Sequence, residues 1–177
     1  LKFVAGPQTD YFRSPDGSVV NNSAVIFTEV DNTKPFTFTA KVQPEFTETG
    51  TYSAGVIYAY ENDTHCQKLC FEQDEYGDHR VVSVRTLGTS DDNNHQAITA
   101  PYVYMRLSSD GTTLGSYFSE DGKIWRMARL YKNDFPEKLL IGISSQSPKD
   151  NEHTCLFTEV SLTDKPVADF RKGNIAE

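Results

Sequence analysis

Hydrophobic and polar residues alternate along several short segments of the chain, and turn-forming residues separate these segments. In residues 36–42, Phe36, Phe38, Ala40 and Val42 alternate with two threonines and a lysine. A period of two places successive side chains on opposite faces of a β-strand. The pattern therefore predicts strands with one buried face.

Similar alternation between turn-forming residues recurs along the whole chain, and no segment shows sustained helical periodicity. About eleven or twelve short strands predict an all-β fold, a jelly-roll β-sandwich of two stacked antiparallel sheets. We expect a single β-sandwich domain over residues 1–177, with 163–177 as a C-terminal surface tail and 88–95 as a polar loop. Short strand-like segments open the chain at residues 3–7 and 11–12. Strands are predicted at residues 24–30, 36–42, 54–60, 66–72, 80–86, 102–107, 139–145 and 154–162, with a hairpin between 114 and 130.

The turn of that hairpin, residues 119–125, contains the single tryptophan of the chain, Trp125. A two-residue loop would put Phe118 opposite Trp125. A turn with Gly122 as a left-handed bulge residue puts Tyr117 opposite Trp125 instead. We favour the bulged turn because it separates apolar from polar side chains. It assigns to the core face Leu114, Phe118, Ile124, Ala128 and Leu130, and to the outer face Tyr117, Trp125, Met127 and Arg129.

The net charge of −8 and the isoelectric point near 5.0 argue against general binding of nucleic acids or anionic membranes. No apolar run approaches the roughly 20 residues that span a bilayer. Cys66 and Cys70 lie on one predicted strand, about 13 Å apart, which is too far for a disulfide. Cys155 can pair with only one of them, so free thiols in a reducing, cytoplasmic compartment are the simpler interpretation.

Strand alternation also suggests a ligand-binding face. If the strands at residues 66–72, 102–107 and 139–145 neighbour the hairpin, polar and aromatic side chains from all of them share one outer face of a sheet. Aromatic rings beside charged and amide groups suit a polar ligand such as a glycan or a small polyol. The alternative is a ladder of ion pairs across neighbouring strands. The candidate ligand-binding residues are Lys68, Glu72, Tyr104, Arg106, Tyr117, Trp125, Arg129 and Gln146.

We expect neither a metal nor a cofactor. The histidines and cysteines around residues 65–70 and 153–155 match no spacing of a structural zinc site. The acidic residues 90–94 offer oxygen ligands for calcium, but a solvated polar turn is the simpler interpretation.

Short motifs in a fixed order are spread over most of the chain. They are Thr9-Asp10-Tyr11-Phe12, Ala54-Gly55-Val56-Ile57, Lys68-x-x-x-Glu72, Val82-Ser83-Val84-x-Thr86 with Ser90-Asp91, Tyr104-x-Arg106, Ser119-x-Asp121-Gly122-x-x-Trp125 and Gln146-Ser147-Pro148. With these motifs the chain resembles the regulation-of-enolase-like proteins, which are largely catalogued as a domain of unknown function. It departs from the family pattern at Ser53, Cys66 and Asp92, where Asp, Trp and Trp are common.

The resemblance implies a concanavalin A-like lectin/glucanase sandwich and no established reaction. Glu72 and Asp74 share a strand face, roughly 6–7 Å apart, and retaining glycosidases use carboxylates about 5 Å apart. The glucanases of the implied fold carry alternating acidic residues on one strand, but Tyr76 takes the third position here. Glu72 is therefore only a weak catalytic candidate, and we lean against an enzyme.

We predict a non-catalytic, lectin-like module that binds a carbohydrate or small polyol through one polar and aromatic sheet face. One alternative is an intracellular regulatory or interaction protein of sugar metabolism, whose acidic surface meets a protein partner. A second alternative is a carbohydrate-active hydrolase with Glu72 as acid or base.

Overall fold

The computed structural model describes residues 1–175, which form fourteen β-strands and no helix. The predicted all-β fold is thus confirmed, with β3 and β9 as strands beyond those expected. No helix in the described range is long and apolar enough to cross a membrane. The strands are β1 (Lys2–Ala5), β2 (Tyr11–Arg13), β3 (Val19–Asn21), β4 (Ile26–Asp31), β5 (Phe36–Pro44), β6 (Ala54–Asn62), β7 (His65–Gln73), β8 (His79–Leu87), β9 (Thr89–Ala97), β10 (Val103–Ser109), β11 (Thr113–Ser119), β12 (Arg126–Lys132), β13 (Lys138–Gln146) and β14 (His153–Thr163).

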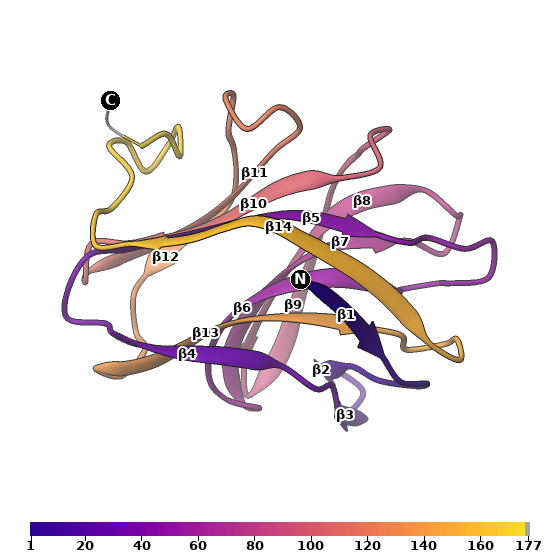
Figure 1. Ribbon diagram of the computed structural model, residues 1–177. Helices are drawn as coiled ribbons and strands as arrows, with labels where there is room; N and C mark the ends of the chain where they lie inside the picture. The colour runs from indigo at the N-terminus through magenta and orange to yellow at the C-terminus, as the bar shows by residue number, and fades with distance from the viewer. Residues whose placement is uncertain (176–177) are drawn as a thin grey trace.

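Two six-stranded antiparallel sheets stack face to face (Figure 1). The first sheet has the order β1-β14-β5-β10-β11-β12, and the second has the order β4-β13-β6-β7-β8-β9. A separate two-stranded hairpin, β2–β3, lies on the side of the second sheet that faces away from the first (Figure 1). The arrangement is the β-sandwich that the strand pattern predicts.

The main core fills the space between the sheets, and the alternating residues of β5 point into it as expected. A second apolar cluster lies on the outer face of the second sheet, around Val56, Tyr58 and Cys70. Tyr11 and Phe12 of the β2–β3 hairpin pack against this cluster. The centre of the second sheet is therefore buried on both faces, which explains why β7 is almost entirely buried.

Residues 88–95 form most of an edge strand, β9, so the predicted polar loop is wrong. Gly88, with a φ of +74°, makes the tight turn from β8, and β9 then pairs along most of β8. An edge strand exposes its side chains to water and does not need the apolar alternation of a buried strand. The polar sequence of β9 therefore gave no hydrophobic alternation from which a strand could be predicted.

The β11–β12 hairpin has neither of the two predicted registers. Phe118 pairs with Arg126 and Tyr117 with Met127, so residues 120–125 form a longer connection between the strands. The Asp121 carboxylate accepts the backbone N–H groups of Lys123 and Ile124, both at 2.8 Å. Gly122 adopts the expected left-handed conformation at a φ of +72°.

The longer connection and a bulge change two predicted core assignments. Ile124 lies in the turn and is 69% exposed, instead of packing in the core. A register shift between Ser116 and Tyr117 then reverses the faces of the rest of β12, so Leu130 pairs with Gly115 on the outer side. The same shift turns Arg129 toward the edge of the second sheet, where its guanidinium contacts Ser83 and Asp91.

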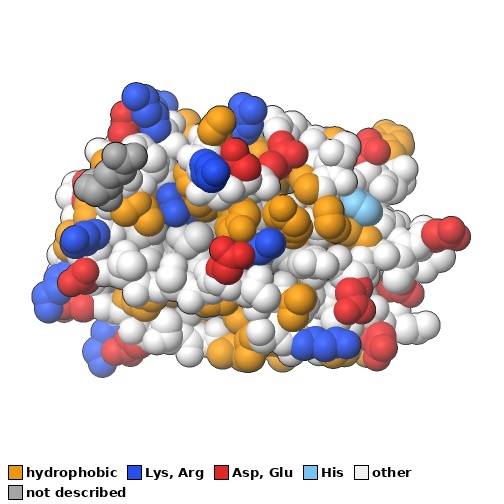
Figure 2. All heavy atoms as spheres, turned by 45° about the horizontal axis from the view of Figure 1, so that its top comes forward, with side chains coloured by type: hydrophobic (Ala, Val, Ile, Leu, Met, Phe, Trp, Pro, Cys, Tyr) orange, Lys and Arg blue, Asp and Glu red, His pale blue; other side chains and the backbone are white. Residues whose placement is uncertain are grey.

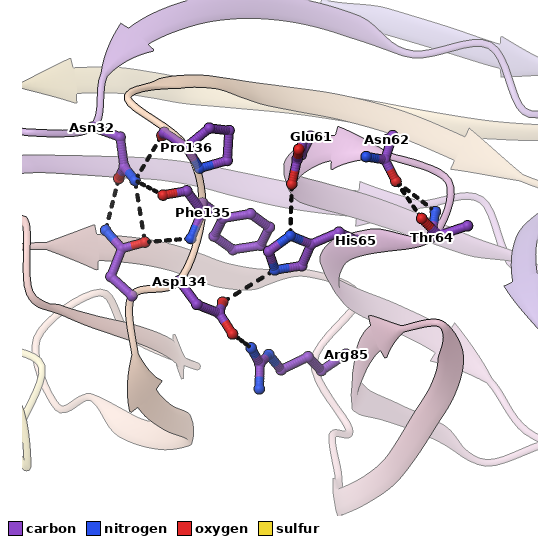
Figure 3. Close-up of polar contacts among 10 residues, drawn as sticks. Asn32, Glu61, Asn62, Thr64, His65, Arg85, Asp134, Phe135 and Pro136 are labelled. Carbon is purple, nitrogen blue, oxygen red and sulfur yellow. Dashed lines mark hydrogen bonds and ion pairs between the residues drawn. The ribbon is translucent and has the colours of Figure 1, made fainter.

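The chain crosses from the first sheet to the second through residues 133–137, and two polar networks hold this crossing (Figure 3). Asn32 and Asn133 exchange amide hydrogen bonds of 3.2 and 2.7 Å, and Asn32 also donates to the Phe135 carbonyl at 3.2 Å. The His65 ring stacks on Phe135 with a centroid distance of 4.3 Å. Its two nitrogens lie 2.6 Å from Glu61 and 3.1 Å from Asp134, whose carboxylate also pairs with Arg85.

We expect Asn133→Leu to lower the free energy of unfolding by about 2 kcal/mol, because it leaves the buried side-chain oxygen of Asn32 without the donor at 2.7 Å. Urea denaturation measures this change. Lys132→Ala, at the exposed neighbouring position, should change stability by less than about 0.5 kcal/mol. The double variant Asn32→Leu/Asn133→Leu should lose less than the sum of the two single variants. Additive losses would show that the two amides do not act as a pair.

Candidate functional site

A pocket of about 810 Å³ opens on the outer face of the second sheet. One wall comes from the β2–β3 hairpin, the floor comes from β7 and the end of β13, and β9 adds a rim. Polar and ionisable side chains predominate in it. The lining residues are Gln8, Asp10, Phe12, Ser14, Ser18, Val20, Asn22, Tyr52, Lys68, Glu72, Glu75, Val84, Asp92, Asn94, Gln146, Pro148 and Lys149.

Lys68 lies in the floor of this pocket and is only 3% exposed. Its ammonium donates to Asp10 at 2.5 Å and to the Gln146 side-chain oxygen at 3.0 Å. Burial by itself lowers the pKa of Lys68, but the Asp10 carboxylate raises it well above the usual value, so the ammonium stays charged. Lysine has three N–H donors, and the third has no partner among residues 1–175.

Glu72 lies on the same face of β7 as Lys68 and is 9% exposed. Removal of water raises the pKa of Glu72 to about 8, although the Lys68 charge acts in the opposite direction. Among residues 1–175, its side chain has one hydrogen bond, a long one of 3.5 Å donated by the Gln146 amide. The raised pKa favours the protonated carboxyl at neutral pH, and the long contact leaves Glu72 hydrogen-bonding capacity for a ligand.

The backbone is strained at two places around the pocket. Among the described residues, Gln8, Tyr52 and Glu159 are the non-glycine residues with a positive φ, and the first two line the pocket. Tyr52, at a φ of 64°, directs its carbonyl to the Gln146 amide at 3.1 Å. Such strain concentrates at functional sites, where the surrounding structure compensates for it.

The structure does not bring the eight candidate residues onto one face. Lys68, Glu72 and Gln146 meet in the pocket of the second sheet. The candidates on β10–β12 belong to the first sheet, because β10 pairs with β5 and β11 and not with β7. Strand alternation correctly places Lys68 and Glu72 on one face of β7, but it does not identify the sheet to which a strand belongs.

The candidates on the outer face of the first sheet are largely engaged by the chain itself. The Arg106 guanidinium lies 3.6 Å from the Trp125 ring centroid and donates to the Gly173 carbonyl at 2.6 Å. The Tyr117 hydroxyl donates to the Phe170 carbonyl at 2.8 Å. The segment after β14 thus packs on this face, up to residue 175 (Figure 1). Residues 176–177 of the expected surface tail lie outside the described residues.

Tyr104 remains closer to solvent on the same face, where its hydroxyl donates to Glu159 at 3.2 Å. Lys41 lies over the neighbouring Tyr102 ring at 4.0 Å. Figure 2 views the molecule from the side of the first sheet, and hydrophobic side chains gather across its middle among single charged groups. This face has aromatic groups, but the ligand-sized pocket lies on the other sheet.

Asp10, Phe12, Tyr52 and Asp92 belong to the pocket, but the sequence did not single them out for this role. Asp10 precedes a three-residue strand and lies 58 positions before its partner Lys68. The only signal for it was the Thr9-Asp10 motif. Asp92 was hidden because residues 88–95 had been assigned to a loop.

Asp74, the second acidic residue of the weak glycosidase pattern, has a structural role. Its carboxylate accepts the backbone N–H groups of Tyr76 and Asp78 at 2.9 Å and pairs with Arg80 at 2.6 Å. Cys66, Cys70 and Cys155 are free and buried, which confirms the prediction of free thiols. Within residues 1–175, no group of three or more His, Cys, Asp or Glu side chains is arranged to hold a metal ion.

Comparison with known proteins gives a family and a fold. Residues 1–165 match the family described as "Protein of unknown function (DUF1349)". A functionally unknown protein from Saccharomyces cerevisiae has a similar structure, with 22% identity, a TM-score of 0.80 and coverage of 92% of this chain and 86% of that one. A search of curated proteins found no significant match.

Two larger proteins, one of them named as a xylosidase, are also similar in structure. The GH43 protein BlXynB from Bacillus licheniformis has 14% identity and a TM-score of 0.69, with coverage of 90% of this chain and 32% of that one. The xylan β-1,4-xylosidase from Bacillus halodurans has 14% identity and a TM-score of 0.62, with coverage of 88% and 32%. The chain therefore spans about a third of the length of these proteins, and the likeness shows the β-sandwich fold alone.

The raised pKa of Glu72 predicts a specific dependence of stability on pH. The folded protein holds this proton up to about pH 8, whereas an unfolded chain releases it near the usual value of 4.5. Between these values the native state binds more protons, so its stability falls as the pH rises. Glu72→Gln lacks this titrating proton. As the pH rises from 5 to 8, its free energy of unfolding should therefore increase relative to that of the wild type by roughly 1 kcal/mol per pH unit.

Urea unfolding of the two proteins at several pH values measures this difference. Asn94→Ala alters a pocket residue without a titratable group and serves as the control. Its free energy of unfolding should differ from that of the wild type by the same amount at every pH. A Glu72→Gln offset that is equally constant from pH 5 to pH 8 would contradict the assignment.

Proposed function

The chain belongs to the DUF1349 family, and on that premise we propose that it binds a carbohydrate or a small polyol in the pocket of the second sheet. The observation that carries the proposal is the buried set of Lys68, Glu72 and Gln146 on the pocket floor. Their positions are fixed by mutual hydrogen bonds, with Asp10 as the anchor of Lys68.

The floor is chemically complementary to hydroxyl groups. A hydroxyl both donates and accepts a hydrogen bond. The third N–H of Lys68 supplies a donor, and the Glu72 carboxyl supplies an acceptor or, when protonated, a second donor. Neighbouring ring hydroxyls of a sugar match such closely spaced groups. The Phe12 side chain lines the same pocket and offers an apolar surface for the C–H groups of a sugar ring.

The β-sandwich likeness to proteins named as a xylosidase and as GH43 proteins supports the choice of ligand panel. A regulatory role of the enolase-regulation kind, a protein partner and a cytoplasmic location remain predictions from the sequence.

We expect titration calorimetry to detect binding of at least one member of a panel of pentoses, hexoses and β-1,4-xylo-oligosaccharides. Gln146→Ala and Glu72→Ala should each weaken that binding by about tenfold, because each removes a buried hydrogen-bonding group at the pocket floor. Trp125→Phe is the matched control, since Trp125 stacks on Arg106 on the first sheet, and it should change affinity by less than about twofold. Absence of binding across the panel, or equal losses in the control and the floor variants, would refute the proposal.

A carbohydrate hydrolase is a second candidate, favoured by the burial of Glu72 on the pocket floor, which raises its pKa to about 8. A raised pKa is what a general acid requires, and Asp92 supplies another carboxylate in the same pocket. If Glu72 is the acid, Glu72→Gln should slow the release of xylose from xylobiose by about a hundredfold or more, while Trp125→Phe keeps the rate. No release of reducing sugar from any oligosaccharide of the panel would remove this candidate.

A further inference from the structure

We propose that the pocket accepts neutral or amine-bearing polyols and excludes sugar acids and sugar phosphates. The inference rests on the proposed function and adds the charge class of the ligand. It follows from the arrangement of ionisable side chains around the pocket, in which the unpaired carboxylates of Glu75 and Asp92 outnumber the unpaired ammonium of Lys149.

Four acidic side chains line the pocket, Asp10, Glu72, Glu75 and Asp92, against the lysines Lys68 and Lys149. Lys68, the deep cation, is already neutralised by Asp10 at 2.5 Å. An anion that reaches the floor therefore meets a neutral ion pair and a carboxyl group, not a free positive charge. Typical phosphate and carboxylate sites present several unpaired Arg or Lys side chains or backbone N–H groups. In this lining Lys149 is the one lysine without an ion-pair partner among residues 1–175, and it is exposed.

Glu75 and Asp92 add a negative rim to this floor. Both residues are exposed, and neither carboxylate has a hydrogen-bond or ion-pair partner among residues 1–175. Lys68 and Arg129 attract the Asp92 charge from a distance, but no direct contact neutralises either carboxylate, so both act on a ligand that enters the pocket. The net charge of −8 over the whole chain acts in the same direction at longer range.

A positively charged amino group on the ligand is attracted to the pocket, whereas an anionic group is repelled. A ligand ammonium near the rim is attracted by Glu75 and Asp92, and its N–H groups suit carboxylate acceptors. Neutral hydroxyls at the floor use the remaining N–H of Lys68 and the Glu72 carboxyl. The expected order of affinity is therefore amine-bearing at least equal to neutral, and neutral above anionic.

Calorimetry with two matched ligand series tests this order. The first series is xylose, glucose, glucosamine and glucuronate, which share ring stereochemistry, and the second is arabinose, galactose, galactosamine and galacturonate. In the series whose neutral sugar binds, the uronate should bind about tenfold more weakly at low salt. The difference should narrow at about 0.5 M salt, because screening weakens the repulsion.

A charge-removal variant isolates the cause. Glu75→Gln/Asp92→Asn should restore most of the uronate affinity and leave the neutral sugar nearly unchanged. Glu120→Gln/Glu137→Gln removes the same number of charges from exposed positions outside the pocket and should restore little.

The possible failures are distinguishable. If no sugar of any charge binds, the proposed function itself fails. If a uronate binds within threefold of its neutral counterpart or more tightly, charge exclusion is overturned while the binding function stands. A uronate that stays weak in Glu75→Gln/Asp92→Asn also overturns the inference, because shape and not charge then excludes it.

Discussion

The ion pair between Lys68 and Asp10 is the interaction on which the second face of the sandwich depends. A buried ammonium is costly unless a countercharge and hydrogen bonds compensate it, and Lys68 receives both from Asp10 and Gln146. Asp10 lies just before β2, so the same contact that keeps Lys68 charged also ties the β2–β3 hairpin to the sandwich. The hairpin in turn forms one wall of the pocket, and burial at the floor of that pocket raises the pKa of Glu72 to about 8.

The two outer faces of the sandwich differ in how far the protein itself satisfies their polar side chains. On the first sheet, the chain's own C-terminal segment satisfies Arg106 and Tyr117 with backbone carbonyls, so these polar groups serve internal packing. On the second sheet, the covering hairpin leaves a polar space unfilled, and the hydrogen-bonding groups of Lys68 and Glu72 remain incompletely used. A binding role fits the second situation better, because unused polar groups at a buried position need a partner.

Local patterns predicted most of the strands and the face of β7 that carries Lys68 and Glu72, because strand periodicity is a local property. They failed where the answer depends on distant contacts. Tyr104 and Arg106 alternate as regularly as Lys68 and Glu72, yet β10 and β7 belong to different sheets. Asp10 acquires its role only from a residue 58 positions away. Ile124 was assigned to the core because the turn was expected to be shorter. The hydrogen bonds of the Asp121 side chain stabilise the longer turn, and such bonds leave no signal in the hydrophobic pattern.

The β2–β3 hairpin is a separate two-stranded unit that shares no strand with either large sheet. Residues 14 and 18, which line the pocket, flank its exposed turn and contribute nothing to the main core. Changes in that turn can therefore reshape one wall of the pocket while the sandwich keeps its stability, provided that Asp10 remains to pair with Lys68. Members of one fold lineage would in this way diversify their ligands by altering a few hairpin residues, much as antibodies vary loops on a constant framework.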